Sequence, residues 1–299
     1  FETNCNDEYI VTAYIWPSCH DDSLGHQYLW DEGIGEWQVI KRGDPRFPGH
    51  YQPRQPLWGY GLDDDPVVVE KWIQTALKYG VNTFCYDWYW FKEGPYLESA
   101  LNDGFLKAPS NREMNFYIMW ANHDVKYNYW NYHKWGDRED LLWTGVIDPE
   151  DWPKIVERVI TLYFNEPNYV KINGCPVFGM FSVYNFVRSF PSEADARMAM
   201  DYFRDEVRKA GFPDLHLQMI DGGLRRLPLS GIEQMENGPC QHGEPCTRRE
   251  RKEGDDPHGG GNDLIDLRLV LQRQRRAHRG DQAHGDGRNE GRGQIIKIL

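Results

Sequence analysis

Two segments of the chain place carboxylates beside aromatic rings, an arrangement that suits acid–base chemistry on a sugar. Residues 87–90 read DWYW and residues 120–124 read WANHD, and each segment lies at the end of an apolar run. One carboxyl group can protonate a leaving oxygen while a second acts as base or nucleophile. Aromatic rings offer flat apolar surface with an occasional polar edge. These segments predict a site that cleaves glycosidic bonds, with Asp87 and Asp124 as catalytic candidates.

A third stretch adds a carboxylate, a histidine and further rings. Glu36 and the sequence FPGHYQPR at residues 47–54 lie in the long loop that follows the first apolar run. Loops of this length in a compact protein are usually functional, so Glu36 joins the catalytic candidates. The candidates for holding the ligand by stacking or hydrogen bonding are Trp16, Trp37, His50, Tyr51, Tyr89, Trp90, Trp120, Asn122 and His123.

Each candidate also has a plain structural alternative. Asp87 could cap the turn after its strand, and Asp124 could belong to an ordinary Asn-His-Asp turn. Glu36 could be a solvated loop carboxylate, and His50 could brace its own loop. Another cluster fits no established ligand spacing, so we predict no metal and no cofactor; it comprises Cys19, His20, Asp21, Asp22 and His26.

The elements that must position these residues alternate between apolar strands and amphipathic helices. Strands are predicted at residues 9–15, 81–88, 115–120, 176–181 and 214–220, and helices at 66–79, 95–107, 148–164 and 192–210. Strands that alternate with helices form βαβ units around a parallel sheet. No G-x-G-x-x-G follows the first strand, which counts against a dinucleotide-binding fold.

Long loops after the first three strands match the active face of a (β/α)8 TIM barrel, where the site lies at the carboxyl ends of the strands. Only about five βα units fit into the first 220 residues. The run LIDLRLVL at 264–271 is the only strand-like segment after them. The predicted fold class is therefore α/β of the TIM-barrel type, incomplete in this chain.

The amino-acid composition of the chain changes abruptly at about residue 220. All 42 aromatic residues lie in residues 1–220 and none in residues 221–299. The first part carries 20 Lys and Arg against 33 Asp and Glu, whereas the second carries 14 against 13. A net charge of −12 argues against nucleic-acid binding, and no apolar run approaches a membrane span. We expect the partner to be a neutral, hydroxyl-rich carbohydrate substrate.

Cysteine usage does not fix the compartment of the protein. The six cysteines show no regular spacing, and Cys85 and Cys175 lie in apolar runs where buried free thiols are expected. The chain begins at Phe1 without an apolar signal core. The localisation stays open between a bacterial periplasm or exterior and the cytoplasm.

Four motifs together resemble the WbsX-type, glycoside hydrolase family 99-like proteins. They are residues 33–56 (GIGEWQVIKRGDPRFPGHYQPRQP), 80–91 (GVNTFCYDWYWF), 118–124 (IMWANHD) and 163–181 (YFNEPNYVKINGCPVFGMF). The resemblance covers about residues 9–220 and implies a (β/α)8 barrel that acts on carbohydrate as a hydrolase or as a glycosyltransferase-associated domain. It implies a cleft lined by Glu36, Trp37, His50, Tyr51, Gln52, Arg54, Asp87, Tyr89, Trp90, Trp120, Asn122 and Asp124.

The resemblance stops where the composition changes. Relatives usually carry a late Asn-x-Trp-Asn-Glu-Trp-like motif that supplies a catalytic glutamate, and nothing like it occurs in this sequence. We therefore expect residues 1–220 to form a partial family 99-like barrel, and residues 221–299 to be an out-of-frame or disordered tail. Three functions follow: a glycosidase that uses paired carboxylates, a non-catalytic glycan-binding or glycan-assembly module, or an inactive truncated product.

Overall fold

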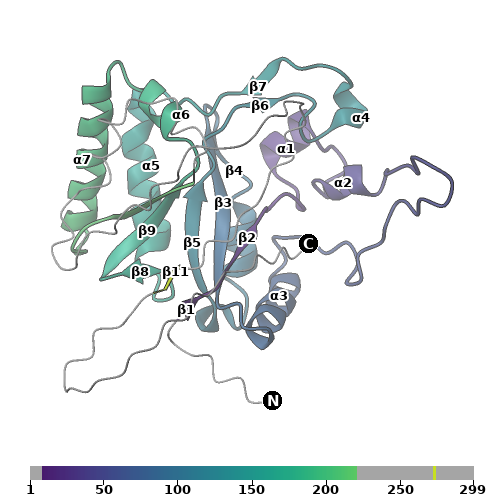
Figure 1. Ribbon diagram of the computed structural model, residues 1–299, viewed down its shortest axis with the longest axis horizontal. Coiled ribbons are helices and arrows are strands. Elements are labelled where there is room, and N and C mark those ends of the chain that lie inside the picture. Colours follow the sequence, from purple (N-terminus) through teal and green to yellow (C-terminus); the bar gives the residue numbers. More distant parts are fainter. Residues whose placement is uncertain (1–8, 221–271, 274–299) are drawn as a thin grey trace, which may run out of the picture.

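A five-stranded parallel sheet forms the centre of the molecule (Figure 1). The structure, a computed structural model, describes residues 9–220 and the two-residue strand at 272–273. The strand order is β10-β9-β5-β3-β2, and every neighbouring pair in it is parallel. The bounds are β2 Thr12–Ile15, β3 Thr83–Phe91, β5 Asn115–Trp120, β9 Cys175–Met180 and β10 His216–Met219.

Short antiparallel strands extend this sheet at its margins. β4 (Gly94–Tyr96) pairs with the end of β3, and β8 (Lys171–Ile172) pairs with the start of β9. β6 (Val125–Lys126) and β7 (Leu141–Trp143) form a ribbon of their own. The remaining pair is β1 with β11, Tyr9–Ile10 against Gln272–Arg273.

The two long helices begin and end at residues suited to those positions. α3 (Pro66–Lys78) starts with proline after Asp65, whose side chain accepts the Val67 N–H, and Gly80 follows it with a positive φ of 82°. α7 (Glu193–Lys209) starts after Ser192, whose hydroxyl accepts the Asp195 N–H. The other helices are α1 Ser23–Tyr28, α2 Trp37–Ile40, α4 Tyr132–Trp135, α5 Trp152–Val159 and α6 Val183–Arg188.

The predicted elements match this arrangement except at three places. The strand predicted at 9–15 is divided into β1 and β2, which pair with different strands. The predicted helix at 95–107 is a π-helical turn at Ala100–Phe105, because Gly94–Tyr96 pairs with β3 as β4. The predicted helix at 148–164 is divided into a 3-10 turn, α5 and a π-helical turn at Ile160–Phe164. The α/β class and the parallel sheet are confirmed. Closure into a barrel stays a prediction, and the predicted tail lies outside the described residues except for β11.

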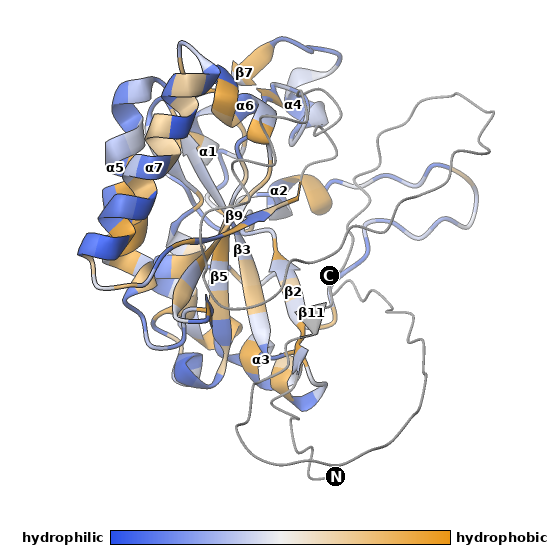
Figure 2. Ribbon diagram, turned by 60° about the vertical axis from the view of Figure 1, so that its left-hand side comes forward, coloured by the Kyte–Doolittle hydropathy of each residue, from blue (hydrophilic) through white to orange (hydrophobic). Residues whose placement is uncertain are grey.

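Side chains alternate between the two faces of the sheet, and one face is covered by helices. Trp120 packs on Trp152 of α5 with ring centroids 5.6 Å apart, and Phe178 packs on Phe203 of α7 at 5.2 Å. Figure 2 shows α5 and α7 together on this side of the sheet. Because side chains alternate along a strand, the neighbours of Trp120 and Phe178 face the other way. The opposite face is therefore the one on which Asp87 lies.

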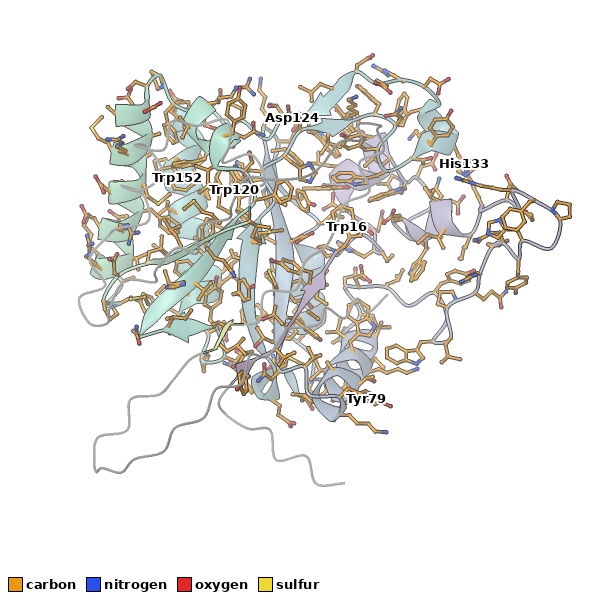
Figure 3. The ribbon with its side chains drawn as sticks, in the orientation of Figure 1. Trp16, Tyr79, Trp120, Asp124, His133 and Trp152 are labelled. Atoms are coloured by element: carbon orange, nitrogen blue, oxygen red, sulfur yellow. The ribbon has the colours of Figure 1, made fainter. Side chains whose placement is uncertain are left out.

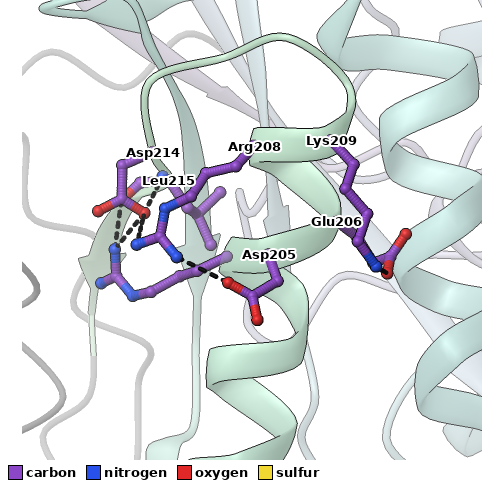
Figure 4. A network of polar contacts seen from close by, with 7 residues as sticks. Asp205, Glu206, Arg208, Lys209, Asp214 and Leu215 are labelled. Carbon is purple, nitrogen blue, oxygen red and sulfur yellow. Dashed lines mark hydrogen bonds and ion pairs between the residues drawn. The ribbon is translucent and has the colours of Figure 1, made fainter.

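A buried ion pair fixes α7 to the strand that follows it (Figure 4). The Asp214 Oδ1 atom accepts from the Arg204 guanidinium at 2.9 Å and from the Leu215 N–H at 2.8 Å. Arg208 reaches the same oxygen at 3.3 Å from the solvent side. These contacts set the position of β10, the last strand of the sheet.

Cys85 and Cys175 are both buried, as expected. Burial raises the pKa of the Cys85 thiol well above its usual range, so this thiol is unreactive at neutral pH. Within the described residues, no helix combines the length and the apolar character needed to cross a bilayer.

Candidate active site

Asp87 is the only acidic residue of β3, whose other members are six aromatic residues, Thr83 and Cys85. β3 reads TFCYDWYWF, and eight of its nine residues are buried. The whole Asp87 residue keeps some exposure, but its Oδ1 atom is enclosed and has no hydrogen-bond partner among the described residues. Burial raises the pKa of the Asp87 carboxyl from 3.8 to about 8. At neutral pH this carboxyl group therefore carries a proton that it can donate.

Aromatic rings surround the end of the strand beyond Asp87. Tyr89 shares its face of β3, and its ring meets Trp16 edge-on at 5.6 Å. Trp130, from the loop between β6 and α4, lies 4.9 Å from Trp16 and 5.9 Å from Tyr89. His123 closes the group at 5.7 Å from Tyr89. Figure 3 shows Trp16 beside the carboxyl end of β2, so the rings gather at the edge of the sheet where the strands end.

Glu36 joins this group through Trp16. Its Oε2 atom accepts the Trp16 indole N–H at 2.7 Å and the Ser18 hydroxyl at 2.6 Å. The Glu36 backbone N–H also binds the Ser18 carbonyl at 2.9 Å. Asp87 and Tyr89 share one face of β3, the Tyr89 ring contacts Trp16, and Trp16 binds Glu36. Two of the three predicted catalytic carboxylates are brought to one aromatic group.

Gly35 makes the position of Glu36 possible. Its φ of +58° is a left-handed conformation, and a Cβ atom there would lie 2.0 Å from the Ser18 carbonyl oxygen. We expect Gly35→Ala to lower the free energy of unfolding by about 3 kcal/mol or more, since strain and overpacking add. Gly49→Ala is the matched control, because Gly49 also has a positive φ but nothing within 4 Å of the added Cβ. It should cost only about 1 kcal/mol in urea unfolding; equal costs would contradict the close-approach argument.

Asp124 directly follows His123 of the aromatic group, but its carboxylate is bound by the loop. It is exposed, and its Oδ1 atom accepts the Gly145 N–H at 2.9 Å and the Thr144 hydroxyl at 3.1 Å. Figure 3 places it in the loops above the sheet, on the far side of Trp16 from α3. These bonds agree with its structural alternative, a loop turn.

Asn122 and Trp120 are enclosed by protein. The Asn122 side-chain amide binds the Ser182 backbone in both directions at 2.7 Å, and the Asn122 backbone carbonyl accepts from the Asn185 side chain. Trp120 is fully buried on the helix-covered face, beside Trp152 (Figure 3). Trp90 is also buried, against Trp88. The structure does not bring Trp120 or Asn122 to the face of Asp87, because one packs under α5 and the other joins β5 to α6.

The residues predicted from the loop at 47–54 are not near Asp87 either. Figure 1 shows the chain between α2 and α3 extending away from the sheet, and Tyr51 and Arg54 are exposed on it. His50 stacks on Phe47 at 4.6 Å, which agrees with its bracing alternative. Trp37 lies at the base, where its indole N–H binds the Gly61 carbonyl at 2.6 Å.

Sequence reasoning missed several groups around the site. Trp130 lies in a loop already noted as aromatic, but nothing in the sequence distinguishes it from its neighbours there. Asp63 is buried, binds the Cys19 N–H at 2.7 Å, and has its pKa raised by burial to about 7. His20 is fully buried, and burial lowers its pKa. Across residues 9–220, no set of three His, Cys, Asp or Glu side chains is arranged to hold a metal ion.

Comparisons with known proteins support the family that the sequence resembles. The family model described as "Glycosyltransferase WbsX" matches residues 11–252. Two proteins described as "Uncharacterized protein WxcX", from two strains of Xanthomonas campestris pv. campestris, are 25% identical over 266 residues and 26% identical over 221 residues. These matches cover 88% and 73% of this chain but only 36% and 29% of the relatives, so the chain spans about a third of their length.

Solved structures with a similar course of the chain are distant. A GH99 endo-alpha-mannosidase from Bacteroides thetaiotaomicron is 14% identical, with a TM-score of 0.40 over 76% of this chain and 58% of its own. A protein described as "Glycoside hydrolase-like protein" is 15% identical, with a TM-score of 0.38 over 73% of this chain and 52% of its own.

Proposed function

Because the chain belongs to the WbsX glycosyltransferase family and is in that sense a carbohydrate-active protein, we propose that it hydrolyses glycosidic bonds of a poly- or oligosaccharide. Asp87 acts as the general acid and Glu36 as the second carboxylate. The partly exposed rings of Trp16 and Trp130 stack on the sugar, and the buried Tyr89 ring supports them from below. The matched part of the chain covers 36% and 29% of the two relatives, so the function of the whole protein is part of the same proposal.

The state of the Asp87 carboxyl group is the observation that carries this proposal. A general acid must hold its proton at working pH and release it to a leaving oxygen. Burial raises the pKa of Asp87 to about 8, and no described residue occupies its Oδ1 atom. A purely structural carboxylate in such a place would have hydrogen-bond donors around it, since an unpaired buried polar group is costly. The absence of donors around Oδ1 supports a role toward a ligand.

Glu36 supplies the complementary chemistry. Two donors, the Trp16 indole and the Ser18 hydroxyl, bind its Oε2 atom and hold the carboxyl group in place. Asp87 would give its proton to the glycosidic oxygen as the bond to the anomeric carbon breaks. Glu36 would either take a proton from the attacking water or bond to the anomeric carbon before water replaces it.

Release of reducing sugar from a panel of polysaccharides tests the proposal. We expect release by the protein and a loss of about 100-fold or more in the variants Asp87→Asn and Glu36→Gln. Asp124→Asn is the control, because this carboxylate braces an exposed loop. Unchanged release in Asp87→Asn would remove Asp87 from the site. Release that is lost only in Asp124→Asn would assign catalysis to that carboxylate.

A glycan-binding or glycan-assembly module is the second candidate. The observation that favours it concerns Asp124, the third catalytic candidate. The Oδ1 atom of this residue already accepts hydrogen bonds from its own loop. Retention on a glycan array without any release of sugar would support this function over hydrolysis.

A further inference from the structure

We propose that the segment between α2 and α3 is a second carbohydrate-binding site, which takes negatively charged groups of a polysaccharide. We call residues 44–57 the arm. That the ligand of the arm is a glycan rests on the proposed function. The new element is that this glycan is negatively charged. The binding surface consists of Arg46, Phe47, Tyr51 and Arg54.

The arm is organised by its own contacts. The His50 N–H binds the Phe47 carbonyl at 3.0 Å, and the His50 Nδ1 atom accepts the Arg46 N–H at 3.1 Å. The Arg54 N–H binds the Gln52 side-chain oxygen at 3.2 Å. Among the described residues, the hydrogen bonds of the arm have both partners within the arm, except that the Pro56 carbonyl accepts the Gly59 N–H at 3.0 Å. The conformation of the arm is therefore held mainly by its own contacts, and Figure 1 shows the arm extending away from the sheet.

The arm also exposes groups that a folded protein usually covers. Tyr51 is 69% exposed and Phe47 is 63% exposed, and Leu57 is more exposed still. Exposed rings on an extended loop cost solvation and are common at binding surfaces. In the sequence Arg46 directly precedes Phe47, and Arg54 follows Tyr51 by three residues.

The arm carries two arginines, Arg46 and Arg54, against one acidic residue, Asp44. Residues 16–40 contain five Asp and Glu and no Lys or Arg. At the base of the arm, Lys41 lies over the Tyr60 ring and Arg42 pairs with Glu32, so both cations are in use. Arg46 and Arg54 are exposed, and neither pairs with a carboxylate of the described residues. Two unpaired guanidinium groups on an acidic protein favour an anionic ligand, and guanidinium matches carboxylate geometry best.

Affinity electrophoresis at low salt tests the site with defined probes. Polygalacturonate should retard the protein, whereas dextran, a neutral polysaccharide, should retard it little. Arg46→Ala/Arg54→Ala should weaken the affinity for polygalacturonate roughly tenfold, since each exposed charge pair contributes up to about 1 kcal/mol. Tyr51→Ala should also weaken it. The matched control, Arg112→Ala/Lys154→Ala, removes two exposed cations that pair with Glu166 and Asp151; it should bind like the parent.

Three other outcomes of these measurements would contradict the proposed site. Equal binding of polyglutamate would show that charge alone is recognised, and would overturn a glycan site. A sedimentation dimer that dissociates in Arg46→Ala/Arg54→Ala would assign the arm to a second copy of the chain. Equal loss in the control pair would reduce the effect to net charge. The measurement requires no turnover, and Asp87→Asn should still bind, so failure of this site and failure of hydrolysis are separate results.

Discussion

Replacing Asp87 with asparagine is expected to abolish sugar release and, in the same variant, to stabilise the fold. The two effects share one cause, the burial of the Asp87 carboxyl group without donors around Oδ1. General acids contribute about 100- to 10,000-fold to the rate, and asparagine has no proton to give. Asparagine is also uncharged at every pH, so folding of the variant does not require the proton that Asp87, ionised in the unfolded chain at neutral pH, must take up. A site residue that costs stability is typical of function.

The stabilisation should depend on pH in a direction fixed by the pKa of Asp87. This pKa rises from 3.8 to about 8 on folding, so the folded chain holds the proton more tightly than the unfolded chain. The favourable contribution is complete below pH 3.8 and is lost as the pH rises toward 8. Four units correspond to about 5 kcal/mol as an upper bound. Relaxation of a partly exposed residue lowers this figure, and we expect about 2–4 kcal/mol at pH 8.

Thermal unfolding of the parent and Asp87→Asn between pH 4 and pH 9 checks this expectation. The melting temperature of the variant should exceed that of the parent by roughly 5–12 °C at pH 8, and the difference should shrink toward pH 4. Asp63 also has a raised pKa, but it is present in both proteins and cancels in the difference. Asp124→Asn should show no such trend. A difference independent of pH would contradict a buried, protonated Asp87.

The sheet could be predicted closely because its strands are unusually apolar. The run at 81–88 and the run at 115–120 admit no other structure once helices flank them, and they are β3 and β5. The helix predicted at 95–107 was wrong in part, because Pro95 and its neighbours complete a hairpin with β3. Pairing across a turn depends on backbone geometry that periodicity does not encode.

The site was harder to predict than the sheet, because the faces of the strands decide it. Asp87 and Trp120 both sit near strand ends, yet they point to opposite sides, one toward Tyr89 and the other under α5. A position near the end of a strand therefore does not distinguish a site residue from a core residue. Glu36 could be proposed as a carboxylate, but its bonds to Trp16 and Ser18 need a chain reversal that only Gly35 permits.

Glu98 carries the second large expected effect, on the helix-covered side of the sheet. It is buried, and its carboxylate accepts the Trp88 indole at 2.8 Å, the Tyr163 hydroxyl at 2.7 Å and the Arg158 Nε at 2.9 Å. Burial alone would raise the pKa of Glu98, but the hydrogen bonds from Arg158 and Tyr163 hold it below its usual value. The carboxylate therefore fastens the segment after β4 to α5 and to β3.

Glu98→Ala should lower the free energy of unfolding by about 3–5 kcal/mol, because it leaves the Arg158 charge and two buried donors without an acceptor. Glu98→Gln should lose less, since its amide oxygen still accepts from Trp88 and Tyr163. The control is Asp103→Ala, which breaks an exposed pair with Lys107 and should change stability by less than about 1 kcal/mol. Urea unfolding at pH 7 gives all three values.

The pH dependence of the same variants separates charge from packing. The pKa of Glu98 is lowered on folding, so its contribution is present above the unfolded value of 4.5 and is lost as the pH falls below it. The gap between the parent and Glu98→Gln should therefore narrow in acid, whereas the packing loss of Glu98→Ala should persist. Folded Glu98→Gln should keep the sugar release of the parent, because Trp88 and Glu98 lie across the sheet from Asp87. If release fell with stability intact, Glu98 would belong to the site and the division of the sheet into a structural and a chemical face would fail.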